Sequence, residues 1–205
     1  MKILVVSYLP KEAQSRTKRL LDTFCKGVKQ KDDIEMLDLV KDEPDFVTPG
    51  ILQAYIQRNY MGQELSPELQ KEISKFDRMT KQFKSADIIV MAFPMYNFSL
   101  PGAIKAYFDS VMLKGETFDT GEKGFVGLMK GKKALVLFTS GGDHTGKNSM
   151  YDYITNLTTL ELEFMGFSDI RVISAQGVDM QSLDTEVLIV DAQKEIKGVV
   201  KDWGL

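Results

Sequence analysis

The chain has 205 residues, 43% of them hydrophobic and 27% charged, with a formal net charge of −3. This length and composition suit one globular domain, residues 1–205, and the mild acidity argues against nucleic acid or an anionic membrane surface as a partner. No apolar run approaches the roughly 20 residues of a membrane-spanning helix, no secretory signal precedes the first apolar run, and the single cysteine excludes an internal disulfide. We therefore expect a cytoplasmic protein.

The first half of the chain alternates strand and helix patterns. Residues 3–6 predict a buried strand, and the helix after it carries apolar residues at helical spacing: Leu20, Leu21, Phe24 and Val28. Residues 34–39 predict a half-exposed strand, and the looser stretch that follows predicts a short helix near 51–60. The next helix, expected over residues 66–84, begins with a capping serine, a proline in the first turn and an acid: Ser66, Pro67 and Glu68.

The second half repeats this alternation. Residues 88–93 predict a strand buried on both faces and ended by Pro94, and the helix after it has an apolar stripe of Ile104, Tyr107, Phe108, Val111 and Met112. A glycine-rich excursion leads to a fourth buried strand at 134–138. The next helix is predicted to bury Ile154, Leu157, Leu160 and Phe164. Residues 170–173 predict a fifth strand, and the last helix, starting near 182–184, carries Leu188, Ala192, Ile196 and Val199.

The alternation of strands and helices predicts an α/β fold in which helices cover both faces of a doubly wound, five-stranded parallel sheet. Right-handed crossovers leave few topologies, and five strands fit the flavodoxin-like strand order 2-1-3-4-5. In that order the loops after the first, third and fourth strands, which start at Ser7, Pro94 and Thr139, open onto one crevice. These are also the three chemically unusual loops of the sequence, so the crevice is the expected ligand site.

The first of these loops ends at Ser15, Arg16 and Thr17, where a helix begins. Free backbone N–H groups at a helix start favour an anion, and two hydroxyls with a guanidinium add donors for a phosphate. An ordinary N-cap explains the same residues equally well. No Gly-x-Gly-x-x-Gly or Walker A pattern occurs, which argues against a dinucleotide Rossmann site or a P-loop.

The loop after the third strand contains Pro94, Met95, Tyr96, Asn97 and Phe98. Large flat or polarizable side chains at this place indicate a site for a flat ring, which we interpret as the isoalloxazine of a flavin, with the amide and backbone groups at its polar edge. The alternative is a hydrophobic plug folded over the sheet. That alternative requires all three large side chains to turn inward.

The third loop, Thr139, Ser140, Gly141 and Gly142, places two glycines after a buried strand. Glycines let a backbone approach a ligand closely and present its N–H groups, although a tight turn is an equal explanation. His144 is the only histidine of the chain. It can shield the ring edge or protonate a reduced product, or it can be a solvent-exposed loop residue.

The remaining candidates predict no further chemistry. Cys25 lies beside Phe24 on a helix stripe, and we interpret it as a small core residue rather than a nucleophile. The sequence contains no metal-ligand spacing, no nucleophile triad and no pair of carboxylates that can be placed together. We therefore nominate no metal site and no catalytic acid or base.

With these residues in place, nearly the whole chain resembles the FMN-dependent NADH azoreductases and NADH:quinone oxidoreductases of the flavodoxin-like superfamily. The resemblance rests on Ser-x-Thr at 15–17, Met-Tyr-Asn-Phe at 95–98, Gly-Lys-Lys-Ala at 131–134 and the glycine pair at 141–142. It implies that residues 15–17 hold the FMN phosphate, that residues 95–98 line the ribityl chain and the ring, and that Thr139 to Gly142 line the ring edge.

The resemblance also implies a homodimer with both sites at the subunit interface, where the segments 41–65 and 114–130 form walls. Three positions depart from the family pattern. Leu9 replaces a serine of the first loop, Ser140 replaces the arginine of a common Arg-Gly-Gly, and Thr120 aligns with an aromatic residue that reaches toward the neighbouring flavin. FMN binding remains the expectation, and these changes bear on substrate preference.

The implied activity is a ping-pong transfer in which NADH or NADPH gives a hydride to the flavin and leaves, and a quinone or aromatic azo compound then takes two electrons in the same slot. A flavodoxin-type electron carrier is the alternative; it requires a strongly acidic docking face, against which the net charge of −3 argues mildly. A flavin-free binding protein is a further alternative. A signalling receiver module is excluded, because Ser7-Tyr8 and Pro94-Met95 occupy the places of its acidic pair and phosphoacceptor.

Overall fold

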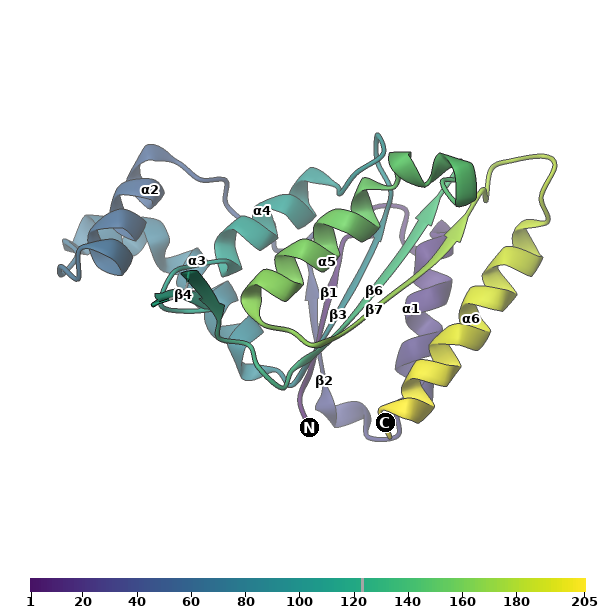
Figure 1. The fold of residues 1–205 in the computed structure, drawn as a ribbon, viewed down its shortest axis with the longest axis horizontal. Helices are drawn as coiled ribbons and strands as arrows, with labels where there is room; N and C mark the ends of the chain where they lie inside the picture. Colours follow the sequence, from purple (N-terminus) through teal and green to yellow (C-terminus); the bar gives the residue numbers. More distant parts are fainter. Residues whose placement is uncertain (123) are drawn as a thin grey trace.

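A five-stranded parallel sheet forms the centre of the computed structural model, which describes residues 1–122 and 124–205 (Figure 1). Its strand order is β2-β1-β3-β6-β7. The strands are β1 (Ile3–Ser7), β2 (Ile34–Asp38), β3 (Ile88–Pro94), β6 (Lys133–Ser140) and β7 (Asp169–Gln176). Counted within this sheet, the order is 2-1-3-4-5, which confirms the predicted flavodoxin-like topology.

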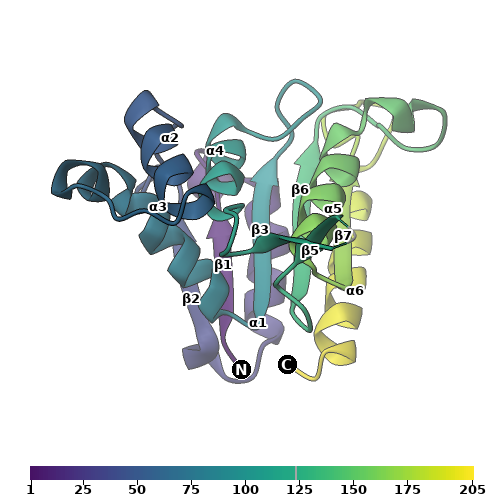
Figure 2. The same cartoon turned by 60° about the vertical axis from the view of Figure 1, so that its left-hand side comes forward.

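Helices cover both faces of the sheet (Figures 1 and 2). One layer contains α1 (Arg16–Gly27) and α6 (Thr185–Asp202), and the other contains α3 (Pro67–Ser85), α4 (Gly102–Val111) and α5 (Tyr153–Met165). Alternate residues of β1 serve the two layers: Ile3 and Val5 pack in the core with α1 and α6, whereas Leu4 and Val6 pack in the core with α3, α4 and α5. Burial on both faces explains why the central strands are apolar throughout.

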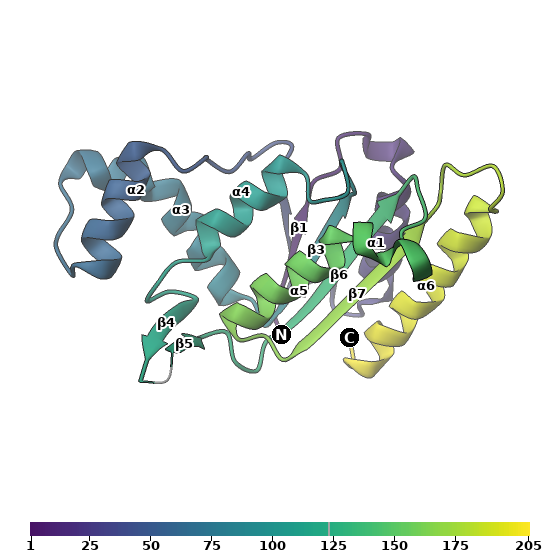
Figure 3. The ribbon, with the colours of Figure 1, turned by 45° about the horizontal axis from the view of Figure 1, so that its top comes forward.

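The register of the strands brings their carboxyl ends to one edge. Ser7 of β1 pairs with Ala92 of β3, and Pro94 of β3 pairs with Thr139 of β6. Pro94 is the last residue of β3 rather than the first residue after it, because a proline at a strand end removes only one ladder donor. The loops that follow these strands therefore start side by side (Figure 3).

Two additions to the sheet lie on the α3–α5 side. Helix α2 (Pro49–Tyr55) continues as a π-helical turn, Ile56–Tyr60, so the predicted short helix is confirmed in position but has two parts. A hairpin of β4 (Phe118–Gly121) and β5 (Gly124–Gly127) was not predicted, since its glycines hide the strand pattern. Short 3₁₀ turns at Glu12–Gln14, Lys31–Asp33 and Gly146–Tyr151 complete the described elements.

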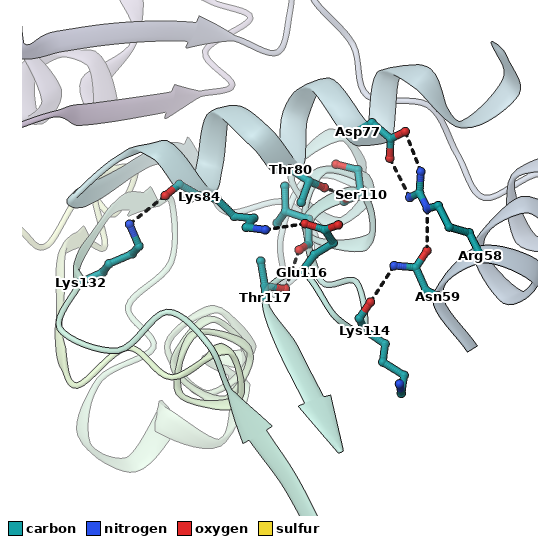
Figure 4. A network of polar contacts seen from close by, with 11 residues as sticks. Arg58, Asn59, Asp77, Thr80, Lys84, Ser110, Lys114, Glu116, Thr117 and Lys132 are labelled. Atoms are coloured by element: carbon teal, nitrogen blue, oxygen red, sulfur yellow. Dashed lines mark hydrogen bonds and ion pairs between the residues drawn. The ribbon is translucent and has the colours of Figure 1, made fainter. Parts of the chain in front are cut away.

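Polar contacts fix the π-helical turn to the body of the domain (Figure 4). The Arg58 guanidinium donates to both carboxylate oxygens of Asp77 on α3, at 2.8 and 2.7 Å. The amide of Asn59 donates to the backbone carbonyl of Lys114 at 2.7 Å.

Of the helices described, none is long and apolar enough to cross a membrane.

The predicted buried stripe of α5 is partly wrong. Leu160 is 63% exposed, whereas Leu162 and Met165 are fully buried with Ile154. The sequence pattern follows apolarity, and α5 has a second apolar stripe beside the buried one. On that stripe the ring of Phe164 contacts the tilted rings of Phe118 and Phe125 of the β4–β5 hairpin, at centroid distances of 4.8 and 5.3 Å.

Candidate functional site

One cleft, with a volume of about 160 Å³, lies at the carboxyl edge of the sheet. Its lining comes from the loops after β1, β3, β6 and β7: Pro10, Lys11, Gln14, Ser15, Arg16, Thr17, Pro94, Met95, Tyr96, Thr139, Gly141, Val178 and Asp179. The prediction that the first three of these loops meet in one crevice is confirmed. The contribution of the loop after β7 was missed, although its strand ends beside β6 at the same edge.

The start of α1 forms one wall of the cleft. Ser15 is the N-cap, and its hydroxyl accepts the backbone N–H of Lys18 at 3.2 Å. Thr17 is buried, and its hydroxyl shares a 2.7 Å hydrogen bond with the hydroxyl of Thr139 at the end of β6. The ordinary N-cap interpretation is therefore confirmed for Ser15. Helix geometry still leaves the N–H groups of Arg16 and Thr17 without intrahelical acceptors, which suits an anion.

The charged side chains at this wall are Lys11, Arg16 and Asp179. Nη1 of Arg16 donates to Oδ1 of Asp179 at 2.5 Å, so the guanidinium that was predicted to hold a phosphate contacts a carboxylate of its own chain. Asp179 did not enter the sequence prediction. The turn composition after β7, with Gly177 before Val178 and Asp179, is the signal that could have indicated a loop at the crevice.

The opposite wall is a tight two-residue turn between Tyr96 and Ser99. Their backbones exchange hydrogen bonds of 3.1 and 3.0 Å, and both central residues have positive φ, 49° at Asn97 and 68° at Phe98. This is the geometry of a type I′ turn, which normally selects asparagine and glycine. A phenylalanine in the left-handed region is a backbone outlier, and such strain of about 1–3 kcal/mol is typical of ligand sites.

The side chains of this turn contradict the hydrophobic-plug alternative. Met95 packs against the core, but Tyr96 is 42% exposed and Phe98 is 51% exposed. The ring of Tyr96 meets the ring of Tyr8 edge-on, with 6.4 Å between their centroids. Partial burial raises the pKa of the Tyr96 hydroxyl, and the neighbouring Tyr8 raises it further. The exposed rings therefore provide flat apolar surface beside the cleft.

A second aromatic group borders the turn on its other side. Phe98 contacts the ring of His144 at 5.5 Å and the ring of Tyr151 at 5.9 Å between centroids. Asn97, Phe98 and His144 thus lie next to the enclosed cleft and not in its lining. His144 is half-buried against the ring of Phe98.

Gln176, the last residue of β7, holds the segment after β6 in place through side-chain hydrogen bonds. Its side-chain carbonyl accepts the backbone N–H of His144 at 3.0 Å and the hydroxyl of Ser140 at 3.4 Å. Its amide donates to Asp152, the N-cap of α5, at 3.3 Å and to Ser174 at 3.2 Å. Ser140 belongs to the end of β6 and is buried, so its side chain faces this network and not the cleft.

The two glycines lie close to different side chains. A Cβ on Gly141 would lie 2.7 Å from Oδ2 of Asp179, so a side chain there would displace the carboxylate. A Cβ on Gly142 would lie 3.2 Å from Nε2 of His144. Gly141 lines the cleft, whereas Gly142 and Ser140 support the loop beside it.

Comparisons with known proteins agree on the kind of molecule. A family model described as flavodoxin-like fold matches residues 1–199. Proteins named FMN-dependent NADH:quinone oxidoreductase are 33% identical in Coprothermobacter proteolyticus, over 98% of this chain and 99% of the relative, and 34% identical in Vibrio parahaemolyticus, over 89% and 90%. An FMN-dependent NADH-azoreductase from Bacillus anthracis, solved in complex with FMN, superposes with a TM-score of 0.85 at 28% identity and 99% coverage of both chains.

Proposed function

The chain belongs to the flavodoxin-like fold family, among the FMN-dependent NADH:quinone oxidoreductases, and we propose that its cleft binds FMN and passes two electrons from NADH or NADPH to quinones or aromatic azo compounds. The observation that carries this proposal is the convergence in one cleft of a helix start, an exposed aromatic turn and a glycine loop. Each of these suits a different part of FMN. A relative that matches 98% of this chain is named FMN-dependent NADH:quinone oxidoreductase.

The donors and surfaces of the cleft fit the parts of this cofactor. The N–H groups at the start of α1, with Lys11 and Arg16, suit the phosphate. The exposed faces of Tyr96 and Phe98 suit the ring, and the backbone around Gly141 can approach the ring edge closely. FMN, when bound, supplies the hydride and electron chemistry. The protein's residues supply orientation, hydrogen bonds and exclusion of water.

We propose that the nicotinamide donor and the acceptor use one slot in turn, as a ping-pong mechanism requires. The position of Tyr96, Phe98, His144 and Tyr151 on one side of the cleft supports a shared slot for flat molecules. The geometry nominates no essential acid or base, because the nicotinamide would supply the hydride and solvent would supply the one further proton that a quinone or azo acceptor takes up with it.

A homodimer is part of the proposal, with two sites at the subunit interface. Three large apolar side chains on α5 and β5 support it: Phe125, Tyr153 and Leu160 are 69%, 55% and 63% exposed. Tyr153 and Leu160 belong to α5, and Phe125 belongs to β5, where it pairs with Thr120 of β4. The free thiol of Cys25 suits the reducing cytoplasm that we propose as the location.

Anaerobic stopped-flow reduction of the FMN-loaded protein tests the activity. NADH or NADPH is expected to bleach the flavin much faster than it bleaches free FMN, and a panel of quinones and azo compounds is expected to restore the colour. A flavodoxin-type carrier would show no such acceleration by either nucleotide. Failure of the protein to take up FMN would refute the proposed function itself.

A further inference from the structure

We propose that Asp179 determines the affinity of the FMN phosphate subsite, because its carboxylate competes with the phosphate for the Arg16 guanidinium and lowers the affinity for phosphorylated flavin. This inference rests on the proposed function. Sequence patterns at the start of α1 indicated a phosphate site made of donors only. The structure adds an acceptor to it.

The contact between the two side chains is direct. Nη1 of Arg16 lies 2.5 Å from Oδ1 of Asp179, and both residues line the cleft. The other carboxylate oxygen occupies the space that a side chain on Gly141 would need, 2.7 Å from the ideal Cβ position. The absence of a side chain at Gly141 thus makes room for the carboxylate inside the site.

The backbone around Asp179 is fixed to the loop after β6. Its N–H donates to the carbonyl of Gly141 at 3.1 Å, and the N–H of Val178 donates to the carbonyl of Ser140 at 3.1 Å. Gly177 adds bonds of 3.0 Å to Ser140 and 2.9 Å to Gly142, with a φ of 82° that favours glycine. The backbone of Asp179 is therefore held beside the cleft.

The charges of the subsite give the direction of the effect. Of the charged residues that line the cleft in the described chain, Lys11 and Arg16 are cationic and Asp179 is anionic. A phosphate at the start of α1 carries up to two negative charges and faces the carboxylate across one guanidinium. Leu9, which packs against the core, provides no hydroxyl to offset this repulsion. The phosphate consequently contributes less to flavin binding than an unopposed arginine would allow.

Asp179→Asn tests this inference with two flavins. The substitution keeps the size of the side chain and removes its charge, and since the Arg16–Asp179 pair is largely exposed, its loss has little effect on folding. FMN and riboflavin are titrated into the wild type and the variant, with quenching of flavin fluorescence as the readout. We expect FMN to bind roughly three- to ten-fold more tightly to the variant, an effect that salt weakens, and riboflavin to bind within about two-fold of the wild type.

Glu186→Gln is the matched control. The two carboxylate oxygens of Glu186 accept hydrogen bonds from Nη1 and Nη2 of Arg19 at 2.7 and 2.6 Å. Arg19 lies one turn after Arg16 on α1, and Glu186 does not line the cleft. Glu186→Gln changes the net charge by the same amount. The hydrogen bonds from Arg19 lower the pKa of Glu186, and the charge of Arg16 also helps to lower it. The side chains of Arg16 and Glu186 share no hydrogen bond, so the variant removes a nearby charge without removing a direct partner of Arg16, and the FMN affinity is expected to stay within about two-fold.

Three results would overturn the inference. Weaker FMN binding by Asp179→Asn would make Asp179 a supporting partner of Arg16, and equal gains for FMN and riboflavin, or for Glu186→Gln, would make the effect nonspecific. Unchanged FMN affinity would show that the carboxylate does not oppose the phosphate. If the wild type and both variants bind neither flavin, the proposed function fails, and that outcome is separate from the other three.

Discussion

The two ends of the sheet differ in whether their polar and aromatic side chains pair within the chain or face open space. At the amino end, chain segments pair with one another: the carboxylate of Asp87 accepts the N–H of Lys2 at 2.8 Å, and the indole of Trp203 donates to Asp169 at 2.9 Å. At the carboxyl end, aromatic rings and helix N–H groups face the cleft. All three non-glycine residues with positive φ in the described chain, Glu12, Asn97 and Phe98, lie in the loops of this end.

This difference separates stability from function. Ordinary backbone geometry and internal pairing at the amino end mean that its residues act mainly on folding. Strained turns and exposed rings at the carboxyl end are typical of a site that binds a ligand. Substitutions at the amino end should therefore change stability and leave flavin affinity alone, and substitutions at the carboxyl end should change flavin affinity.

The largest expected effect is on stability at the amino end. Trp203 is 7% exposed, and Lys133 lies over its ring at 5.4 Å. Trp203→Ala should lower the free energy of unfolding by about 3–5 kcal/mol, because it leaves a cavity under α6. Urea denaturation measures this loss, and FMN titration is expected to show affinity within about two-fold of the wild type for the folded protein. Trp203→Phe keeps most of the packing and serves as the control; a large loss of flavin affinity in either variant would break the comparison.

The next largest effect is expected at the carboxyl end. Gln176→Leu removes four hydrogen bonds and leaves the Asp152 carboxylate and the His144 N–H without this partner. We expect a loss of about 2–3 kcal/mol in the free energy of unfolding, together with weaker FMN binding, since the loop at 140–144 loses its support. Ser174→Ala removes one bond to the same amide without touching that loop, so its flavin affinity should not change. Equal flavin affinities of all three proteins would contradict the role assigned to Gln176.

A pH-dependent effect is expected on the α4–α5 face, away from the cleft. Burial raises the pKa of Glu161 to about 7 from an ordinary value of 4.5, opposed by Lys105 and reinforced by Asp109. The folded state therefore holds this proton more tightly than the unfolded state, and the associated stability is lost as pH rises from about 4.5 through about 7. Glu161→Gln should exceed the wild type in free energy of unfolding by about 1–2 kcal/mol at pH 8, and the gain should shrink toward pH 5.

Glu163→Gln provides the control for that pH dependence, because Glu163 is exposed on the same helix. Its free energy of unfolding should follow the wild-type pH profile. A pH-independent gain in Glu161→Gln, measured by urea denaturation across this range, would argue that the carboxyl is solvated.

The smallest expected effect concerns backbone strain. Phe98→Gly should raise the free energy of unfolding of the apoprotein by about 1 kcal/mol, because glycine adopts a φ of 68° without strain. Phe98→Ala loses the same ring but keeps the backbone penalty, so it should show no gain. Both variants should bind FMN more weakly than the wild type. A stability of Phe98→Ala equal to that of Phe98→Gly would show that the turn stores no strain.

The fold and the position of the site followed from local patterns in the sequence. The alternation of strands and helices, with right-handed crossovers, predicted the strand order, and that order placed the loops at Arg16, Tyr96 and Gly141 together. Asp179 could not be found in this way, because its role depends on a side-chain contact with Arg16 across 163 positions of sequence. Nor could the burial of Thr17 and Ser140, which depends on where each side chain points at the end of its element.

Hydrogen–deuterium exchange of the apoprotein with and without FMN tests the central claim most directly. We predict that FMN slows exchange in residues 10–17, 94–99, 139–144 and 177–180, with no change at the amino end around Lys2, Asp87 and Trp203. Protection that spares these four loops, or the absence of any protection at saturating FMN, would contradict the account.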